Sequence, residues 1–162
     1  MKYIELTQGK QAIVDDEDFE FLNKWKWHVK NNGRKKVFYA VRGIWDNERN
    51  NNRFVRMHRE ILKVSIDLEI DHINRNGLDN RRCNLRICNG TQNKGNVKMW
   101  KNNSSGYKGV GYMERLKKWR ARIHFENKEF HLGMYKTPQE AALAYNQAAL
   151  KYFGEFALLN QI

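Results

Sequence analysis

The sequence has little proline, little cysteine and few acidic residues. Pro138 is the only proline among 162 residues, so domain boundaries must be read from clusters of Gly, Asn and charged residues. The two cysteines, Cys83 and Cys88, form no CxxC motif and have no second pair, which excludes a disulfide framework and a zinc knuckle. No internal repeat or heptad pattern is visible, and this argues against solenoids and coiled coils.

Long apolar runs are also missing. No stretch approaches the ~20 apolar residues that a membrane-spanning helix requires, so we expect no membrane partner. The N-terminal residues Met1 to Glu5 lead directly into polar sequence, which argues against a signal or transit peptide. We therefore expect a cytoplasmic protein that is not secreted.

Positive charge dominates the chain. There are 30 Lys and Arg residues against 18 Asp and Glu, which gives a formal net charge of +12. Such a surplus favours a polyanionic partner, because Lys and Arg that neutralise phosphates release bound counterions. Apolar residues make up 41% of the chain, which is compatible with folded modules. We expect nucleic acid as the partner and no small-molecule substrate; a merely solvated basic surface is the alternative.

The first hundred residues read as a small β-rich segment followed by a polar stretch. Strands are expected at residues 12–14, 38–41 and 54–57, and alternating apolar residues predict another at 25–29. Short helical segments are expected at 15–24 and 58–62, a turn at 31–36 and a polar loop at 46–52. The polar stretch from Asp71 to Asn96 holds most of the residues that could do chemistry.

The last third of the chain predicts a three-stranded antiparallel sheet packed on one helix. Strands are expected at 107–113 and 118–125, with a third that continues the apolar face through Phe130, Leu132 and Met134. Thr137 before Pro138, with a carboxylate at Glu140, predicts a capped helix start. The polar cluster at 101–106 reads as a linker. We thus expect an α+β protein with modules at residues 1–100 and 107–162.

Asp71 and His72 place an acid beside a histidine. Phosphodiester hydrolysis needs a base to deprotonate water, a divalent metal to stabilise the leaving oxygen and hard oxygen ligands for that metal. His72 suits the base, whereas Asp71 and Asn93 offer oxygen ligands. His72, Asn84 and Asn93 follow one another at intervals of twelve and nine residues.

With this spacing, the segments at 71–74, 84–86 and 92–93 resemble the active-site segment of HNH endonucleases, particularly phage homing endonucleases. The resemblance implies a ββα-metal core in which His72 is the general base and Asp71 and Asn93 hold one divalent metal. It also implies that Asn84 keeps the base histidine in place. Arg86 is a candidate for phosphate contact or loop bracing.

The metal implied by this resemblance is Mg²⁺, with Mn²⁺ as the alternative, because the ligands are oxygens. A histidine-rich neighbourhood also admits a transition metal. The upstream segment Met57–Arg59 looks like the one that precedes the active site in these enzymes. For His58 we expect packing or a phosphate contact rather than catalysis.

Residues 107–110, 119–123, 132–133 and 140–149 resemble the Apetala-two or ethylene-response-factor DNA-binding domain. That resemblance implies a sheet laid in the DNA major groove, where cations reach phosphates and guanine edges. Gly111 and Met113 stand where plant relatives usually carry arginines, so we expect phosphate positioning with modest specificity. The DNA-binding candidates are Lys108, Lys118, Arg120, Arg122 and His124.

Together these features predict a metal-dependent, homing-type endonuclease that acts on double-stranded DNA, as a monomer rather than a homodimer. If the protein is phage-encoded, the compartment is the cytoplasm of the host cell. The alternative is a non-catalytic DNA-binding protein or transcription regulator. A ribosomal or other RNA-binding protein would also account for the charge, but it leaves the spacing of His72, Asn84 and Asn93 unexplained.

Overall fold

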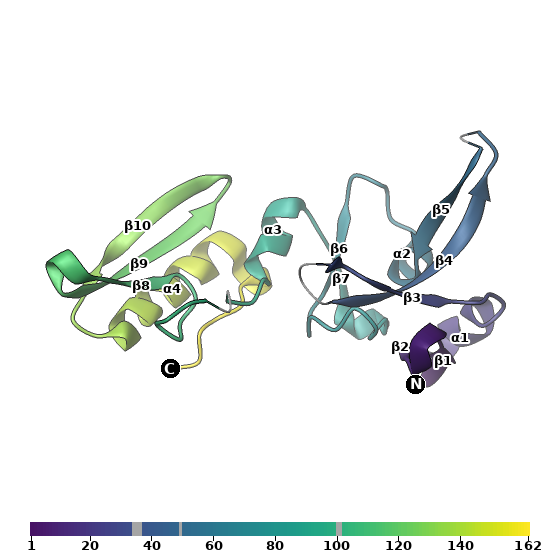
Figure 1. The fold of residues 1–162 in the computed structure, drawn as a ribbon, viewed down its shortest axis with the longest axis horizontal. Coiled ribbons are helices and arrows are strands. Elements are labelled where there is room, and N and C mark those ends of the chain that lie inside the picture. The colour runs from purple at the N-terminus through teal and green to yellow at the C-terminus, as the bar shows by residue number, and fades with distance from the viewer. Residues whose placement is uncertain (34–36, 49, 100–101) are drawn as a thin grey trace. The chain divides into compact units, whose positions relative to one another are not determined.

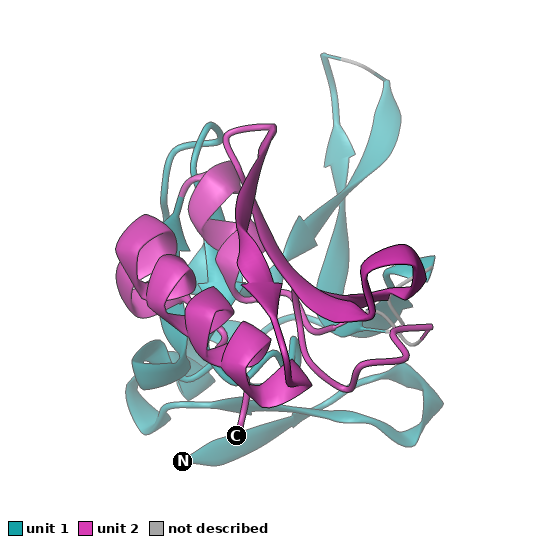
Figure 2. Cartoon of the chain, turned by 90° about the vertical axis from the view of Figure 1, so that its left-hand side faces the viewer, with its two compact units in different colours: residues 1–88 teal, residues 89–162 magenta. Residues whose placement is uncertain are grey.

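The computed structural model describes residues 1–33, 37–48, 50–99 and 102–162 (Figure 1). The expected turn at 31–36, loop at 46–52 and linker at 101–106 therefore each lie partly outside the described residues. The chain divides into two compact units, residues 1–88 and residues 89–162 (Figure 2). The division into domains at 101–106 stays a prediction. Over the described ranges, no helix is long and apolar enough to cross a membrane.

Unit 1 consists of small antiparallel sheets and short helices. Its first sheet pairs β1 (Lys2–Glu5) with β2 (Gln11–Val14). The second has the order β3 (His28–Asn31), β4 (Phe38–Asp46) and β5 (Asn51–Arg56). The third pairs β6 (Glu69–His72) with β7 (Leu85–Cys88). Helical segments are η1 (Thr7–Gly9), α1 (Asp16–Leu22), α2 (Met57–Leu62) and η3 (Arg82–Asn84). The β-rich character expected for this part is confirmed.

The segment before β3 differs from the expectation. Residues 25–29 were expected to form one strand, but the strand begins only at His28. Trp27 is instead held by the end of α1, since its indole N–H donates to the carbonyl of Leu22 at 2.8 Å. The alternation of apolar residues here marks burial in the core of unit 1 rather than strand pairing throughout.

One apolar cluster supports unit 1. Side chains of the two N-terminal strands meet those of α1, α2 and the β6–β7 hairpin; the most deeply buried include Ala12, Val14, Leu22, Trp27 and Met57. Burial of a large aliphatic side chain contributes ~1.5–3 kcal/mol. The hairpin β6–β7 joins this cluster through Ile70 and Leu85, so the same core fixes the strands that carry Asp71, His72 and Arg86.

Unit 2 contains the sheet-on-helix arrangement expected from the sequence. The sheet has the order β10 (Lys128–Tyr135), β9 (Lys118–Phe125) and β8 (Val110–Met113). The long helix α4 (Pro138–Phe153) packs on it, with Ala141 and Ala142 against Val110 and Ala121 (Figure 1). The other helical segments are α3 (Gly90–Gly95), η4 (Glu114–Leu116) and η5 (Gly154–Phe156).

The predicted start of α4 is confirmed. The Thr137 side chain accepts from the backbone N–H of Glu140 at 3.2 Å, and the Glu140 carboxylate accepts from the N–H of Thr137 at 3.3 Å. This reciprocal pair satisfies two N–H groups that a helix start otherwise leaves unpaired. With Pro138 in the first turn, the cap fixes where α4 leaves the sheet.

The expectation for Met134 is wrong. The pairing of β10 with β9 shifts between His131 and Gly133, so an extra residue interrupts the alternation. Beyond this bulge Met134 lies opposite Arg120, on the cationic face, and Tyr135 takes its place on the apolar face opposite Trp119. A one-residue register shift exchanges the two faces of a strand, and the apolar alternation in the sequence does not reveal it.

Two glycines of unit 2 give a test of the packing between sheet and helix. Gly109 has a φ of +76°, and a Cβ there would overlap the Tyr145 ring and lie 2.6 Å from the Arg122 carbonyl oxygen. We expect Gly109→Ala to lower the free energy of unfolding by ~2–5 kcal/mol, from backbone strain and overpacking together. Gly111 is the matched control, because nothing lies within 4 Å of its added Cβ. Urea denaturation of both variants checks this; equal midpoints would contradict it.

Candidate active site and DNA-binding surface

The β6–β7 hairpin carries three of the candidate site residues. Its register sets Asp71 opposite Arg86 and His72 opposite Leu85. The guanidinium of Arg86 donates from Nε at 2.9 Å and from Nη2 at 2.7 Å to Oδ2 of Asp71. Both side chains are largely buried, with 8% of Asp71 and 14% of Arg86 exposed. A charge-assisted pair with two hydrogen bonds fixes the orientation of the carboxylate, so Arg86 braces Asp71.

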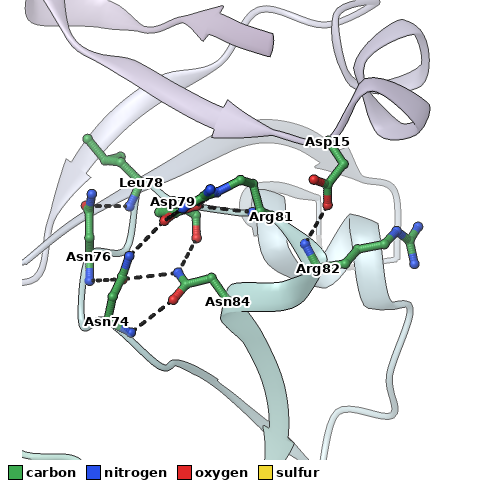
Figure 3. A network of polar contacts seen from close by, with 8 residues as sticks. All are labelled: Asp15, Asn74, Asn76, Leu78, Asp79, Arg81, Arg82 and Asn84. Atoms are coloured by element: carbon green, nitrogen blue, oxygen red, sulfur yellow. Dashed lines mark hydrogen bonds and ion pairs between the residues drawn. The ribbon is translucent and has the colours of Figure 1, made fainter. Parts of the chain in front are cut away.

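The loop between β6 and β7 is held by a network of amide side chains (Figure 3). The Asn84 oxygen accepts from the backbone N–H of Asn74 at 3.0 Å, and its Nδ2 donates to the carbonyl of Asp79 at 2.7 Å. Asn74 in turn donates to the Asp79 carboxylate at 2.7 Å, and that carboxylate also receives two bonds from Arg81. Asn84, at the end of the loop, is thus bonded to the start and the middle of the loop that follows His72. The role implied for Asn84 in holding a base histidine stays a prediction.

Unit 1's N-terminal strands hold the same loop from the other side. Ile13 on β2 donates its N–H to the carbonyl of Leu78 and accepts from the N–H of Asn80, both at 2.8 Å. Arg82 binds the carboxylates of Asp15 and Asp18 at 2.7 Å (the Asp15 bond is drawn in Figure 3). The N-terminal strands are therefore part of the support of the candidate site.

His72 lies in a buried cluster of rings. Its ring centroid is 5.0 Å from that of His58 and 5.8 Å from that of Tyr39, and only 5% of the residue is exposed. Its Nε2 lies 3.3 Å from Oδ1 of Asn80. Burial lowers the pKa of His72. The imidazole is therefore neutral at pH 7, which is the form that can accept a proton from water.

His58 packs against His72 from α2. It is 3% exposed, and burial lowers its pKa to about 2, with further lowering by His72 and nearby arginines. Protonation of His58 would place a positive charge beside His72 in a low-dielectric environment, which is unfavourable. The structure thus agrees with the packing role that was expected for His58.

Asn93, the second expected metal ligand, belongs to unit 2. It lies on α3, where its backbone N–H donates to the carbonyl of Asn89 at 3.0 Å. Asn89 and Gln92 form a capping box at the start of this helix. Across the described ranges, no group of three or more His, Cys, Asp and Glu side chains is placed to hold a metal ion. The assignment of Asp71 and Asn93 as metal ligands stays a prediction.

Strand β9 carries four of the five DNA-binding candidates in one row. Lys118, Arg120, Arg122 and His124 alternate with Ala121 and Ile123, which are 0% and 2% exposed. Glu129 on β10 partly neutralises one end of the row, since its Oε2 lies 2.8 Å from Arg122 and 3.0 Å from His124. Arg120 lies between Gly111 and Met134, which carry no charge. The predicted alternation of core and cation is confirmed for this strand.

Lys108 has different surroundings. Its ammonium donates to the carbonyl of Gly95 at 2.7 Å and lies 5.9 Å from the Tyr145 ring centre on α4. The side chain is partly buried. Lys108 therefore contributes to the packing of unit 2, and its contact with DNA stays a prediction.

A basic groove on unit 1 was missed by the sequence analysis. It lies along β4 and β5 and is lined by apolar residues, including the exposed Phe54, by Glu60, which pairs with Arg42 at 3.2 Å, and by five cations: Lys30, Arg42, Arg53, Arg56 and Arg59. The Lys30 ammonium lies 4.1 Å from the Phe54 ring centre. Cations beside an exposed aromatic ring are typical of nucleic-acid grooves. In the sequence, Arg42 is separated from Arg53 and Arg56. These three arginines come together only because β4 pairs with β5.

Comparison with known proteins found one family model and several relatives that match this chain. Residues 105–155 match the AP2 domain family. An uncharacterised HNH endonuclease of Acanthamoeba polyphaga mimivirus is 29% identical over 161 residues, which cover 96% of this chain and 77% of the viral protein. An ethylene-responsive transcription factor of Arabidopsis thaliana is 45% identical over 58 residues, 35% of this chain and 14% of the plant protein.

These matches support an HNH plus AP2 architecture, in which the endonuclease relative suggests a nuclease and the AP2 domain suggests DNA binding. Protein 3.8 of Escherichia phage T7 is 31% identical over 88 residues, which cover 54% of this chain and 72% of the phage protein. The chain belongs to the same family as this phage protein.

The buried neutral His58 predicts acid sensitivity of unit 1. Below pH ~6.5 the unfolded chain binds a proton at His58 that the folded chain excludes down to about pH 2, so unfolding becomes easier as the pH falls. Below pH 6, the unfolding free energy of the wild type should fall relative to that of His58→Phe by ~1.4 kcal/mol for each pH unit. Urea titrations at several pH values measure it. The exposed His28→Phe is the control, and a parallel pH dependence of all three proteins would contradict the prediction.

The cation row on β9 predicts salt-dependent DNA binding. Arg120→Ala should weaken duplex binding and reduce the slope of log affinity against log salt by ~0.9, if the residue neutralises one phosphate. Lys151→Ala removes the same charge from α4 and should leave the slope unchanged. Fluorescence anisotropy with labelled duplex at several salt concentrations separates the two. Equal effects of both variants would mean that net charge, rather than this face, sets the affinity.

Proposed function

We propose that the protein is a metal-dependent endonuclease of the homing type that hydrolyses phosphodiester bonds in double-stranded DNA. The observation that carries the proposal is His72, a buried neutral imidazole beside Asp71 in a hairpin whose loop is fixed by Asn84. The endonuclease relative spans this region as well as the rest of the chain. A histidine that only packs in the core would not need Asp71 and Arg86 beside it, nor a loop fixed by hydrogen bonds.

In this proposal His72 accepts a proton from the attacking water. Its neutral form gives the base, and its packing against His58 and Tyr39 fixes the ring. Asn84 keeps the loop closed behind His72, and Arg86 holds the carboxylate of Asp71 in place. Each of these side chains acts without moving, which is the preorganisation that such catalysis depends on.

In this proposal one hard divalent cation would take oxygen ligands from the chain. Asp71 would supply a carboxylate and Asn93 an amide oxygen, since Mg²⁺ commonly takes only one or two protein carboxylates while substrate phosphates and water complete its shell. A cation held there would stabilise negative charge on the leaving oxygen. Mg²⁺ is the ion proposed, with Mn²⁺ as its substitute. The sequence order of β6, β7 and α3 is that of a ββα-metal core, which we include in the proposal.

Unit 2 would bind the DNA on which unit 1 acts. The match to the AP2 domain supports this, and the cations on β9 supply phosphate contacts. The basic groove along β4 and β5 offers further contacts within unit 1. Because both units belong to one chain, binding by one raises the effective concentration of the other at the DNA. A monomer is then sufficient for binding and cleavage.

Cleavage of a supercoiled plasmid library with random inserts tests the proposal. The wild type should nick or linearise DNA with Mg²⁺ and stop when the ion is chelated. His72→Ala should lose ~10²–10⁴-fold in rate while its DNA affinity stays nearly unchanged, because the base contributes to the reaction rather than to binding. His28→Ala, an exposed histidine on β3, is the matched control and should cleave normally.

Two results would decide against this function. An active His72→Ala protein would remove His72 as the base. Tight binding of the library without cleavage in Mg²⁺ or Mn²⁺ would favour a DNA-binding regulator instead.

A further inference from the structure

The sheet formed by β3, β4 and β5 has one face on the core of unit 1 and one face away from it. Val29 lies opposite Ala40 in the pairing of β3 with β4, and both side chains belong to the apolar core. Side chains alternate between the faces along a strand, so Gly43 and its partner Phe54 lie on the other face. We call this the outer face. Its exposed residues include Lys30, Gly43, Trp45, Phe54 and Arg56.

Two large aromatic side chains are exposed on the outer face. Trp45 and Phe54 each have 57% of their surface exposed. Trp45 lies two residues after Gly43, the partner of Phe54, so the two rings are diagonal neighbours on the same face. Figure 1 shows the end of the β4–β5 hairpin projecting away from the other elements of unit 1. Exposed aromatic side chains gathered on one face mark a binding surface.

The sheet is open beside the Phe54 ring. Its partner Gly43 has no side chain, and a Cβ added there would meet nothing within 4 Å. A larger residue at position 43 would occupy the space between Phe54 and Trp45. With glycine there, a flat group can approach the backbone of the sheet and lie against the rings.

The charge of the outer face indicates which kind of group this is. The Lys30 ammonium lies 4.1 Å from the Phe54 ring centre, and the guanidinium carbon of Arg56 lies 5.4 Å from the Tyr39 ring centre. Within β3, β4 and β5 as the structure describes them, the outer face carries no Asp or Glu. Aromatic rings set among cations suit a nucleic-acid strand, whose bases stack on the rings while its phosphates meet the cations.

The spacing of the rings favours an unpaired strand over a duplex. In a duplex, neighbouring bases of one strand are ~3.4 Å apart and cover each other's faces. Diagonal neighbours in an antiparallel sheet are ~7–8 Å apart, so only bases that have separated from one another can stack on both rings.

We propose that the outer face binds an unpaired stretch of DNA, with bases stacked on Phe54 and Trp45 and phosphates neutralised by Lys30 and Arg56.

The outer face also leads towards the candidate base. Tyr39 lies opposite Lys30 in the sheet, and its ring centre is 5.8 Å from that of His72. A strand held on Phe54 and Trp45 therefore continues past Arg56 and Tyr39 in the direction of His72. This step rests on the proposed nuclease function, and it makes the substrate a duplex that contains an unpaired stretch.

Fluorescence anisotropy with a labelled short oligothymidylate tests the binding site in the full chain. Phe54→Ala and Trp45→Ala should each weaken binding by ~5–150-fold, the effect of losing one stacked base. The slope of log affinity against log salt should not change, because neither variant removes a charge. Phe54→Tyr keeps a ring and should bind like wild type. Tyr3→Ala, which removes a 49% exposed ring from β1, is the matched control and should also bind like wild type.

An abasic oligonucleotide of the same length gives a test that needs no variant. It keeps the phosphates and lacks the bases, so wild type should bind it more weakly than oligothymidylate. Equal affinities for the two would overturn the proposal, as would equal effects of Phe54→Ala and Tyr3→Ala. Self-association of wild type that is lost in Phe54→Ala, with unchanged oligonucleotide affinity, would assign the outer face to a second copy of the chain instead.

A duplex with a central unpaired bubble separates this proposal from the nuclease function. Wild type should prefer it to the fully paired duplex, and Phe54→Ala should lose that preference. Cleavage of paired DNA by a protein without the preference would overturn the binding site alone. The preference in a protein that cuts no DNA in Mg²⁺ or Mn²⁺ would uphold the binding site and overturn the nuclease function alone.

Discussion

The loop between β6 and β7 is closed by Asn84, which bonds to the backbone of both Asn74 and Asp79. Twelve residues, most of them polar, lie between the strands, and these hydrogen bonds restrict them to one conformation. With the ends tied, Leu78 and Asn80 reach Ile13, and Gly77 packs on β4 so closely that a Cβ would lie 2.7 Å from the Tyr39 ring. The surroundings of His72 follow from this closure.

Burial of charge around the site follows a consistent pattern. Three buried carboxylates of unit 1, those of Asp18, Asp71 and Asp79, are each paired with an arginine from the β6–β7 region. A buried carboxylate without a partner is costly, and a paired one with two hydrogen bonds is tolerated. Burial lowers the pKa of the His58 and His72 imidazoles, which favours their neutral forms. Part of the chain's large positive charge therefore serves the architecture of the site and is not available to DNA.

Features set by neighbours in the sequence were predictable. The capped start of α4 and the alternation of core and cation on β9 both follow from residues a few positions apart. Features set by distant contacts were not. Trp27 is fixed by α1, and the bulge in β10 exchanges Met134 and Tyr135 between faces. The groove cations gather only when β4 and β5 pair. None of these three features can be predicted from the pattern of neighbouring residues in the sequence.

Asn80 shows the same limit within the site itself. In the sequence it is one of several asparagines in a polar stretch, and spacing alone draws attention to His72, Asn84 and Asn93 instead. Its position depends on Ile13, 67 residues earlier in the chain, as the sequence numbers show. The ring of His72 is contacted by Tyr39, His58 and Asn80, which come from different elements of unit 1. The candidate base can be read from a motif, whereas the contacts that hold its ring require the tertiary structure.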